Sequence, residues 1–381
     1  MNFNLTEDQQ LIRETIRDFA ETEVWPGAAE RDRESRFPRE ILAKLAELGF
    51  MGCLVPEVLG GSGIDSISYA ITIEELARVD AALAVTVAVH NSVACFPIRK
   101  WGTEEQKKKY LPDMAAGQVL GAFALTEPQA GSDAANQKTR AVRRGDHYVL
   151  DGVKAWCTNA PEAGVIIVMA VTDPTRGAKG ISAFIVEKDT PGCTIGTIED
   201  KMGLRSSKTS ELVLEDCAVP AENLLGPEGA GLKVALSVLG ASRTGIGAQS
   251  VGIAQGAYEE ALKYAKMREA FGKTIAEFQA IQFMLADMAT RIEAARLLVY
   301  LAAFREDEGE TRLARYSSMA KLFASEMANE VTGQAVQIHG GYGFSREYPV
   351  ERYYRDARVT TIYEGTSEIQ RIVIARDLLR E

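Results

Sequence analysis

The acidic residue Glu364, near the C-terminus, has surroundings that suit general base catalysis. Ile362 and Tyr363 give it an apolar approach, and Gly365 permits backbone angles that are closed to other residues. A carboxylate on an apolar wall is poorly hydrated, which raises its pKa towards the working pH of an enzyme. Glu364 is therefore a candidate catalytic base, and the alternative is an ordinary exposed acid in a loop.

A helix is expected directly after this turn. Thr366 and Ser367 are favoured N-cap residues, and Ser367 with Gln370 forms a capping-box pattern. The spacing predicts a helix to about Leu379, with an apolar stripe that consists of Ile369, Ile372, Val373 and Leu378.

Two segments in the middle of the chain suit a flat, polar cofactor. Residues 126–133 combine Thr and Ser hydroxyls, Pro, Gly and free backbone N–H groups, which can hold an anion or a polar ring edge. The alternative is a plain surface turn. Trp156 and Thr158 are two residues apart, hence on one face of a strand, and can wall an aromatic cofactor. A core Trp is the commoner use of such a residue.

Two later segments suit a nucleotide, each with an ordinary alternative. Arg268 and Phe271 are close enough to pair with a phosphate and to stack on a purine, or Arg268 is a favourable cation at a helix end. Residues 337–343 offer bare backbone after a helix, which is equally a C-cap. Residues 245–252 hint at a dinucleotide fingerprint, but Ser250 replaces its third Gly and no strand precedes it. We therefore reject an NAD site there and expect close packing of two helices.

Composition excludes several classes of function. The 381 residues have a net charge of -10 and no Lys/Arg-rich run, which argues against nucleic-acid binding. No apolar run of about 18 residues is evident, so no membrane span is expected. The five cysteines are scattered and the three histidines have no ligand spacing, so we expect a reducing compartment and no metal. The acidic N-terminal segment 1–8 indicates a cytoplasmic protein, or a mature form from the mitochondrial matrix.

The expected elements are ordered as helices, then strands, then helices. Residues 1–120 are predicted to be helical, with a capping box at Thr6 and Gln9 and a short helix over 103–114 that Pro112 interrupts. Residues 121–230 are predicted to form a small β-barrel or sandwich, with a hairpin that turns at 143–146. Residues 231–381 are predicted to form an antiparallel bundle of long helices. The fold class is thus α+β and multidomain.

Taken together and in this order, these segments resemble the acyl-CoA dehydrogenase family of flavoproteins over essentially the whole chain. They look closest to its short-chain, butyryl-CoA-type branch. The most specific motifs are Thr126-Glu-Pro-x-Ala-Gly-Ser132, Trp156-Cys-Thr158, Arg268-x-x-Phe-Gly272, Gln337-Ile-His-Gly-Gly341 and Tyr363-Glu-Gly-Thr366. The resemblance implies an N-terminal helical domain, a central β-barrel and a C-terminal four-helix bundle. It also implies FAD as cofactor and a homotetramer made of two dimers, with the adenosine end of FAD reaching the neighbouring subunit.

The resemblance also implies roles for residues. Glu364 resembles the base that removes the α-proton of an acyl-CoA thioester while hydride passes to flavin N5, which gives a trans-2-enoyl-CoA. Electrons would then leave to an electron-transferring flavoprotein, for which Ile64 is a candidate anchor. The residues that resemble flavin contacts are Phe123, Leu125, Thr126, Gly131, Ser132, Trp156, Thr158, Thr366 and Glu368. Those that resemble contacts from the neighbouring subunit are Arg268, Phe271, Gln279, Gln337, Ile338, Gly340 and Gly341. Those that resemble contacts to the CoA thioester are Ser132, Arg243 and Gly365.

Some positions depart from the family pattern. Ser242 stands where some members carry the base and cannot act as one at pH 7, which strengthens Glu364. Gly240 replaces a common Asp near the CoA arm, and Gln129 replaces a common Gly in the flavin loop. Three alternatives stay open: an oxidase-like enzyme that uses oxygen, a dehydrogenase for a cyclic acyl-CoA, and a non-catalytic helical assembly protein of the same fold. The acyl group depends on pocket depth, expected to be set by residues around 85–93 and 240–242.

Overall fold

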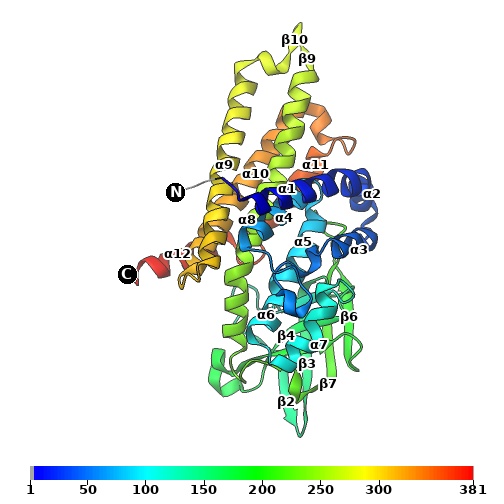
Figure 1. The fold of residues 1–381 in the computed structure, drawn as a ribbon, viewed down its shortest axis with the longest axis vertical. Helices are drawn as coiled ribbons and strands as arrows, with labels where there is room; N and C mark the ends of the chain where they lie inside the picture. Colours follow the sequence, from blue (N-terminus) through cyan, green and yellow to red (C-terminus); the bar gives the residue numbers. More distant parts are fainter. Residues whose placement is uncertain (1–3, 381) are drawn as a thin grey trace.

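The computed structural model describes residues 4–380, and Figure 1 shows an elongated molecule with strands at one end and long helices towards the other. The expectation about segment 1–8 therefore falls partly outside the described residues. The N-terminal part is helical, as predicted. Its elements are α1 (Glu7–Phe19), α2 (Trp25–Glu34), α3 (Arg39–Glu47), α4 (Ser66–Ala77), α5 (Ala81–Val89), α6 (Phe96–Trp101) and α7 (Glu104–Ala115).

Two local predictions in this part have opposite outcomes. The capping box at Thr6 and Gln9 is confirmed, because the Gln9 amide donates to Thr6 Oγ1 at 3.2 Å and the Thr6 amide donates to Gln9 Oε1 at 3.1 Å. The interruption at Pro112 is wrong, since α7 continues through it to Ala115. Proline removes only its own N–H, and the Pro112 carbonyl still accepts from the Ala116 amide at 3.0 Å.

One segment is longer and more apolar than we expected. The helical stretch Ala81–Trp101 has a mean hydropathy of 1.6 over its most apolar window, enough by length and composition to cross a membrane. That window is completely buried within the protein. The expectation that no such run exists is therefore wrong, and burial identifies this stretch as a core helix of the N-terminal part.

The central part is a β domain, as predicted. Its strands are β1 (Gly121–Ala124), β2 (Arg140–Arg144), β3 (His147–Thr158), β4 (Val165–Val171), β5 (Ile181–Glu187), β6 (Cys193–Ile198), β7 (Thr209–Pro220) and β8 (Leu224–Leu225). They form one sheet in the order β6-β7-β3-β2-β4-β5-β8, and β1 pairs in parallel with β4. The predicted hairpin is confirmed, since β2 and β3 are antiparallel with Arg144 opposite His147. Strands β1, β6 and β8 were not predicted as strands.

The C-terminal part contains the predicted long helices. Its elements are α8 (Gly231–Met267), the hairpin β9 (Glu269–Ala270) and β10 (Lys273–Thr274), α9 (Gln279–Asp307), α10 (Leu313–His339), α11 (Val350–Ala357) and α12 (Ser367–Leu378). The small residues of α8 do allow close helix packing. A Cβ on Gly252 would lie 2.1 Å from the Glu74 carbonyl oxygen, and one on Gly256 would lie 2.2 Å from that of Arg78. Helix α8 therefore rests directly on the backbone of α4.

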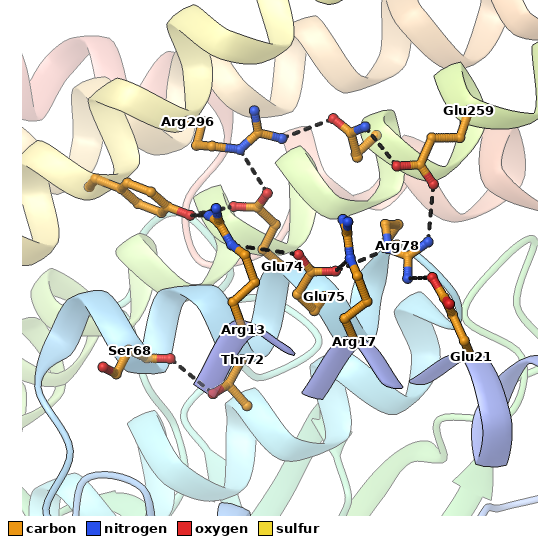
Figure 2. Close-up of polar contacts among 12 residues, drawn as sticks. Arg13, Arg17, Glu21, Ser68, Thr72, Glu74, Glu75, Arg78, Glu259 and Arg296 are labelled. Atoms are coloured by element: carbon orange, nitrogen blue, oxygen red, sulfur yellow. Dashed lines mark hydrogen bonds and ion pairs between the residues drawn. The ribbon is translucent and has the colours of Figure 1, made fainter. Parts of the chain in front are cut away.

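An ion-pair network also joins α4 to helices far away in the sequence (Figure 2). Glu75 accepts from Arg17 of α1 and from Arg78, each at 3.0 Å. Glu74 accepts from Arg296 of α9 at 2.8 Å and from the Tyr300 hydroxyl at 3.2 Å. Because both glutamates are buried, these partners must stay in place, and the network holds the N-terminal helices against the C-terminal bundle.

Candidate active site

Glu364 lies in a tight turn between the 3₁₀ segment Arg358–Thr361 and α12. Its backbone is left-handed, with φ of 52°, and Gly365 follows with φ of 95°. A left-handed residue other than glycine costs about 1–2 kcal/mol, so the surroundings must hold Glu364 in this conformation.

The carboxylate of Glu364 is held at one oxygen. The Ser242 hydroxyl, on α8, donates to Glu364 Oε2 at 2.6 Å. Burial raises the pKa of Glu364, and the Ser242 hydrogen bond and the charges of Lys321 and Arg243 oppose that rise without cancelling it. A carboxylate with a raised pKa is a stronger base than an exposed one, which is the property expected of Glu364 from the sequence.

The two carbonyls of the turn are fixed by side chains from three helices. Gln370 donates to the Glu364 carbonyl at 3.2 Å and to the Gly365 carbonyl at 2.7 Å. Arg243 donates to the Glu364 carbonyl at 3.4 Å, and Lys321 donates to the Gly365 carbonyl at 2.8 Å. The predicted contact of Arg243 with the CoA thioester stays a prediction; in the described structure its buried guanidinium supports the turn.

The capping box predicted from Ser367 and Gln370 is wrong. The N-cap of α12 is Thr366, whose side chain accepts from the Ile369 amide at 3.4 Å. The buried Ser367 hydroxyl has no hydrogen-bond partner within the described part of the chain. Gln370 cannot complete a box because its amide is directed back to the Glu364 turn. Gln370, which fits a capping box by its spacing, therefore holds the carbonyls of the Glu364 turn instead.

The residue before Glu364 is also anchored. The Tyr363 hydroxyl donates to Gln249 Oε1 of α8, and Gln249 in turn donates to the Ala81 carbonyl at 2.9 Å. Our sequence reading did not find Gln249, Lys321 or the contact of Ser242. Each lies on a helix face far from Glu364 in sequence, and no local spacing points to them.

A second group of predicted residues gathers where β1 meets β3. The Ala155 amide donates to the Thr126 carbonyl at 2.9 Å, which joins the loop after β1 to the strand that carries Trp156 and Thr158. Trp156 is 59% exposed and left-handed, with φ of 58°. Thr158, with the nearby Phe123, Leu125 and Thr126, is half-buried, whereas Gly131 and Ser132 are exposed on the loop. The structure therefore presents an aromatic ring and hydroxyls on one accessible face.

The loop 126–133 is fastened by a buried ion pair. Glu127 accepts from Lys154 Nζ at 2.7 Å and from the Thr139 amide at 3.0 Å on one oxygen. Its other oxygen accepts from Gln129 Nε2 and from the Lys138 amide, both at 2.6 Å. Burial alone would raise the pKa of Glu127, but the Lys154 charge and these hydrogen bonds outweigh it and lower the pKa to about 2. Gln129, the departure from the family pattern, thus helps to hold the loop.

A third group lies at the opposite end of the molecule, near the β9–β10 hairpin (Figure 1). A hollow of about 540 Å³ is lined by Arg268, Ile338, Gly340, Gly341 and Tyr342, among others. The Arg268 guanidinium lies 5.6 Å from the centre of the Tyr342 ring. Phe271, at the hairpin tip, is 96% exposed, and Gln279 and Gln337 are exposed as well. A smaller hollow of about 390 Å³, beside the Glu364 turn, contains Thr366 and Glu368.

Comparison with known proteins identifies the family. Family profiles for the N-terminal, middle and C-terminal domains of acyl-CoA dehydrogenase match residues 6–118, 122–217 and 229–379. The chain belongs to the acyl-CoA dehydrogenase family. It is an oxidoreductase of the family's three-domain fold, and its cofactor is FAD.

Individual relatives are similar over their full length. The short-chain specific acyl-CoA dehydrogenase of Clostridium acetobutylicum is 48% identical, with 100% of each chain covered. The solved butyryl-CoA dehydrogenase from Megasphaera elsdenii has a TM-score of 0.98 at 47% identity, again over 100% of each chain. A chain in the solved structure of the electron transferring flavoprotein of Acidaminococcus fermentans has a TM-score of 0.99 at 52% identity, over 100% of each chain.

The described residues of this acyl-CoA dehydrogenase fit FAD. An exposed Trp156 beside loop hydroxyls suits a flat ring with polar edges. Arg268 and the bare backbone of Gly340 and Gly341 suit a pyrophosphate, and a Cβ on either glycine would meet nothing within 4 Å. Among residues 4–380, no group of three or more His, Cys, Asp or Glu side chains could hold a metal ion.

Proposed function

We propose that this protein oxidises a short-chain or branched acyl-CoA to the trans-2-enoyl-CoA, with Glu364 as the base that removes the α-proton. The observation that carries the proposal is the geometry of the Glu364 turn. Its carboxylate has a raised pKa, its backbone is left-handed, and four other side chains hold the residue in place. Similarity to the short-chain relatives supports the substrate class. FAD, when bound, supplies the acceptor for the β-hydride.

In this proposal, one oxygen of Glu364 is available to accept the α-proton. Ser242 occupies Oε2, and Oε1 has no hydrogen-bond partner among the described residues. The α-proton of the substrate therefore goes to Oε1, while the Ser242 hydroxyl keeps the carboxyl group from rotating. Proton transfer needs close approach, so a fixed Oε1 favours the reaction.

The backbone of the same residue can polarise the substrate. The Glu364 N–H donates to no group among the described residues, so it is available for the thioester oxygen. Negative charge develops on that oxygen as the α-proton leaves, and a fixed N–H donor stabilises it. The left-handed turn thus places an acceptor for the proton and a donor for the oxygen on one residue.

The decisive experiment is the visible spectrum of the purified protein before and after anaerobic addition of a series of acyl-CoAs. We expect the protein to be yellow and to be bleached by a short or branched acyl-CoA. The Glu364→Gln variant should also be yellow, but no acyl-CoA should bleach it. If only a cyclic acyl-CoA bleaches the protein, the proposed substrate class is wrong and the substrate is a cyclic acyl-CoA. A protein that stays colourless with added FAD would overturn the proposal and favour a non-catalytic member of the fold.

We further propose that the electrons pass to an electron-transferring flavoprotein. Similarity to a chain in a solved structure of such a flavoprotein supports this acceptor. Ile64 remains a candidate anchor, although it is half-buried and packs on the core, whereas nearby Val58 is fully accessible. Hydrogen peroxide release without the partner would identify an oxidase instead. Unchanged partner-dependent turnover in Ile64→Ala would exclude the anchor.

We also propose that FAD binds between two copies of the chain in a homotetramer. Ser242, which contacts Glu364, and Met267, next to Arg268, are separated along α8 by about 38 Å at the rise of a helix, longer than one dinucleotide. Exposed apolar residues at helical spacing on α9, namely Leu297, Leu301 and Phe304, suit contact with a second copy.

A complementation experiment tests this shared site. Subunits with Glu364→Gln and subunits with Arg268→Ala are inactive separately in this proposal. In a mixed assembly, one site receives both defects and another receives neither, so activity returns. If each chain held its own FAD, mixing would restore nothing, and the shared site would be excluded.

A further inference from the structure

Lys321 is a buried cation whose role the family comparison does not assign. It lies in the middle of α10 and is completely inaccessible to solvent. Its Nζ donates to the Gly365 carbonyl at 2.8 Å, and no other hydrogen bond of this ammonium is found among the described residues. Burying an ammonium is costly, so a lysine at this position needs a compensating interaction.

The charges around Lys321 come from four elements. Glu364 in the active turn, Glu326 on α10 and Glu368 on α12 attract the ammonium, whereas Arg243 on α8 repels it. Burial lowers the pKa of Lys321 to about 8, and the three carboxylates limit the fall. Lys321 therefore carries its charge at neutral pH, next to the carboxylate of the base.

The position of this contact gives it control over the base. Gly365 is the second left-handed residue of the turn, and it directly precedes Thr366, the N-cap of α12. Gln370 shares that carbonyl, but it belongs to α12 itself and moves with the turn. Among residues 4–380, Lys321 and Arg243 are the side chains that tie the backbone of the turn to the long helices of the bundle.

We propose that Lys321 is a positioning residue for Glu364, which fixes the left-handed turn to α10 and stabilises the carboxylate form of the base by its charge. This inference rests on the proposed role of Glu364 as the base. It predicts two separable effects of Lys321, one on the geometry of the turn and one on the ionisation of Glu364.

Two substitutions separate these effects. Lys321→Met removes both the donor and the charge, whereas Lys321→Gln keeps a donor for the Gly365 carbonyl without the charge. The measurement is the rate of anaerobic flavin bleaching by a substrate acyl-CoA from pH 6 to pH 9, with flavin content and substrate affinity measured in parallel. Loss of one charge-assisted hydrogen bond should slow bleaching by Lys321→Met on the order of 10-fold or more.

The pH profile provides a readout that a purely structural role would not change. In both variants the acidic limb of the profile should move to higher pH, because the base loses a neighbouring positive charge. Lys321→Gln should recover most of the rate at alkaline pH, where Glu364 is ionised. If the pH profile of Lys321→Gln equals that of the parent protein, the inference is overturned. This test holds even if Lys321→Met does not fold.

Controls distinguish this inference from the proposed function. Lys188→Met removes another lysine bond to a backbone carbonyl, that of Pro161 at 2.6 Å in the β domain, and should leave rate and profile unchanged. If Glu364→Gln bleaches at the parental rate, the proposed base is wrong. If Glu364→Gln is inert but both Lys321 variants keep the parental rate and profile, only the role of Lys321 is wrong.

Discussion

Replacement of Glu127 by Gln tests whether the buried ion pair holds the loop 126–133, which we propose contacts FAD. The carboxylate of Glu127 accepts four hydrogen bonds, two on each oxygen. A carboxamide has one oxygen, so its NH₂ group would face donors such as Gln129 Nε2 or the Lys138 amide. The substitution also leaves the buried Lys154 ammonium without a counter-charge. The loop should therefore lose both its hydrogen bonds and its charge balance.

The size of the effect follows from the pKa. In the folded protein the pKa of Glu127 is about 2, against 4.5 for an unperturbed glutamate, and this difference corresponds to about 3 kcal/mol at pH 7. Breaking a buried ion pair by removing one partner costs about 3–5 kcal/mol, which is the same order. Because the folded pKa is lowered, this stabilisation is present above pH 4.5 and is lost as the pH falls towards 2.

The assay is urea unfolding of the holoprotein at pH 7, followed by far-UV circular dichroism and by flavin fluorescence. Glu127→Gln should lower both midpoints and release flavin first. The double substitution Glu127→Gln and Lys154→Met should recover part of the loss, since it removes the unpaired charge. Glu228→Gln, an exposed acid that accepts from the Tyr148 hydroxyl in the same domain, should change little. Parental midpoints and flavin content in Glu127→Gln would refute the reasoning.

Three further predictions concern the base, a buried acid and helix packing. Ser242→Ala removes the hydrogen bond to Glu364, which is worth about 1.5–3 kcal/mol. It should shift the acidic limb of the pH–rate profile up by about 1–2 pH units. Ser250→Ala on the same helix is the control and should not shift the profile. Burial raises the pKa of Asp356 to about 7, so between pH 4 and pH 7 this carboxyl group keeps its proton in the folded protein and loses it in the unfolded chain. Stability should therefore fall from pH 4 to pH 7. Asp356→Asn should make the melting temperature less dependent on pH over that range, and an unchanged slope would contradict this. Gly252→Ala brings a Cβ against the α4 backbone and should lower stability to urea by about 1–3 kcal/mol, whereas Gly333→Ala, in an open part of α10, should be neutral or stabilising.

The parts of the fold that depend on local pattern could be predicted from the sequence. Apolar residues at helical spacing predicted the long helices of residues 231–381, among them α8 and α10, and the Thr6 capping box is a contact between near neighbours. Strand β6 was missed because Gly196 and its polar neighbours interrupt the alternation typical of strands. Strand β1 was missed because its small residues carry little strand preference, and burial against β4 determines it instead.

The turn at Glu364 could be predicted from the sequence, but the side chains that hold it could not. The positive φ of Gly365 agrees with the backbone freedom expected of a glycine before a helix, whereas the left-handed backbone of Glu364 was not predicted. Ser242 and Lys321 contact this turn from 122 and 44 residues away, and only the packed bundle brings them there. Gln370 shows the limit of local rules, because a long-range demand for carbonyl partners overrides its capping pattern.

The network around α4 has a consequence for how the chain folds. Among the described residues, both hydrogen-bond partners of the Glu74 carboxylate lie on α9, and Arg296 is 222 residues further along the chain. Until α9 arrives, Glu74 can be buried only as an unpaired acid, so the N-terminal helices should stay loosely packed. Such distant contacts slow folding, since a long loop must close before they form. The N-terminal helices are made before the bundle, but they are expected to pack fully only after the bundle docks onto them.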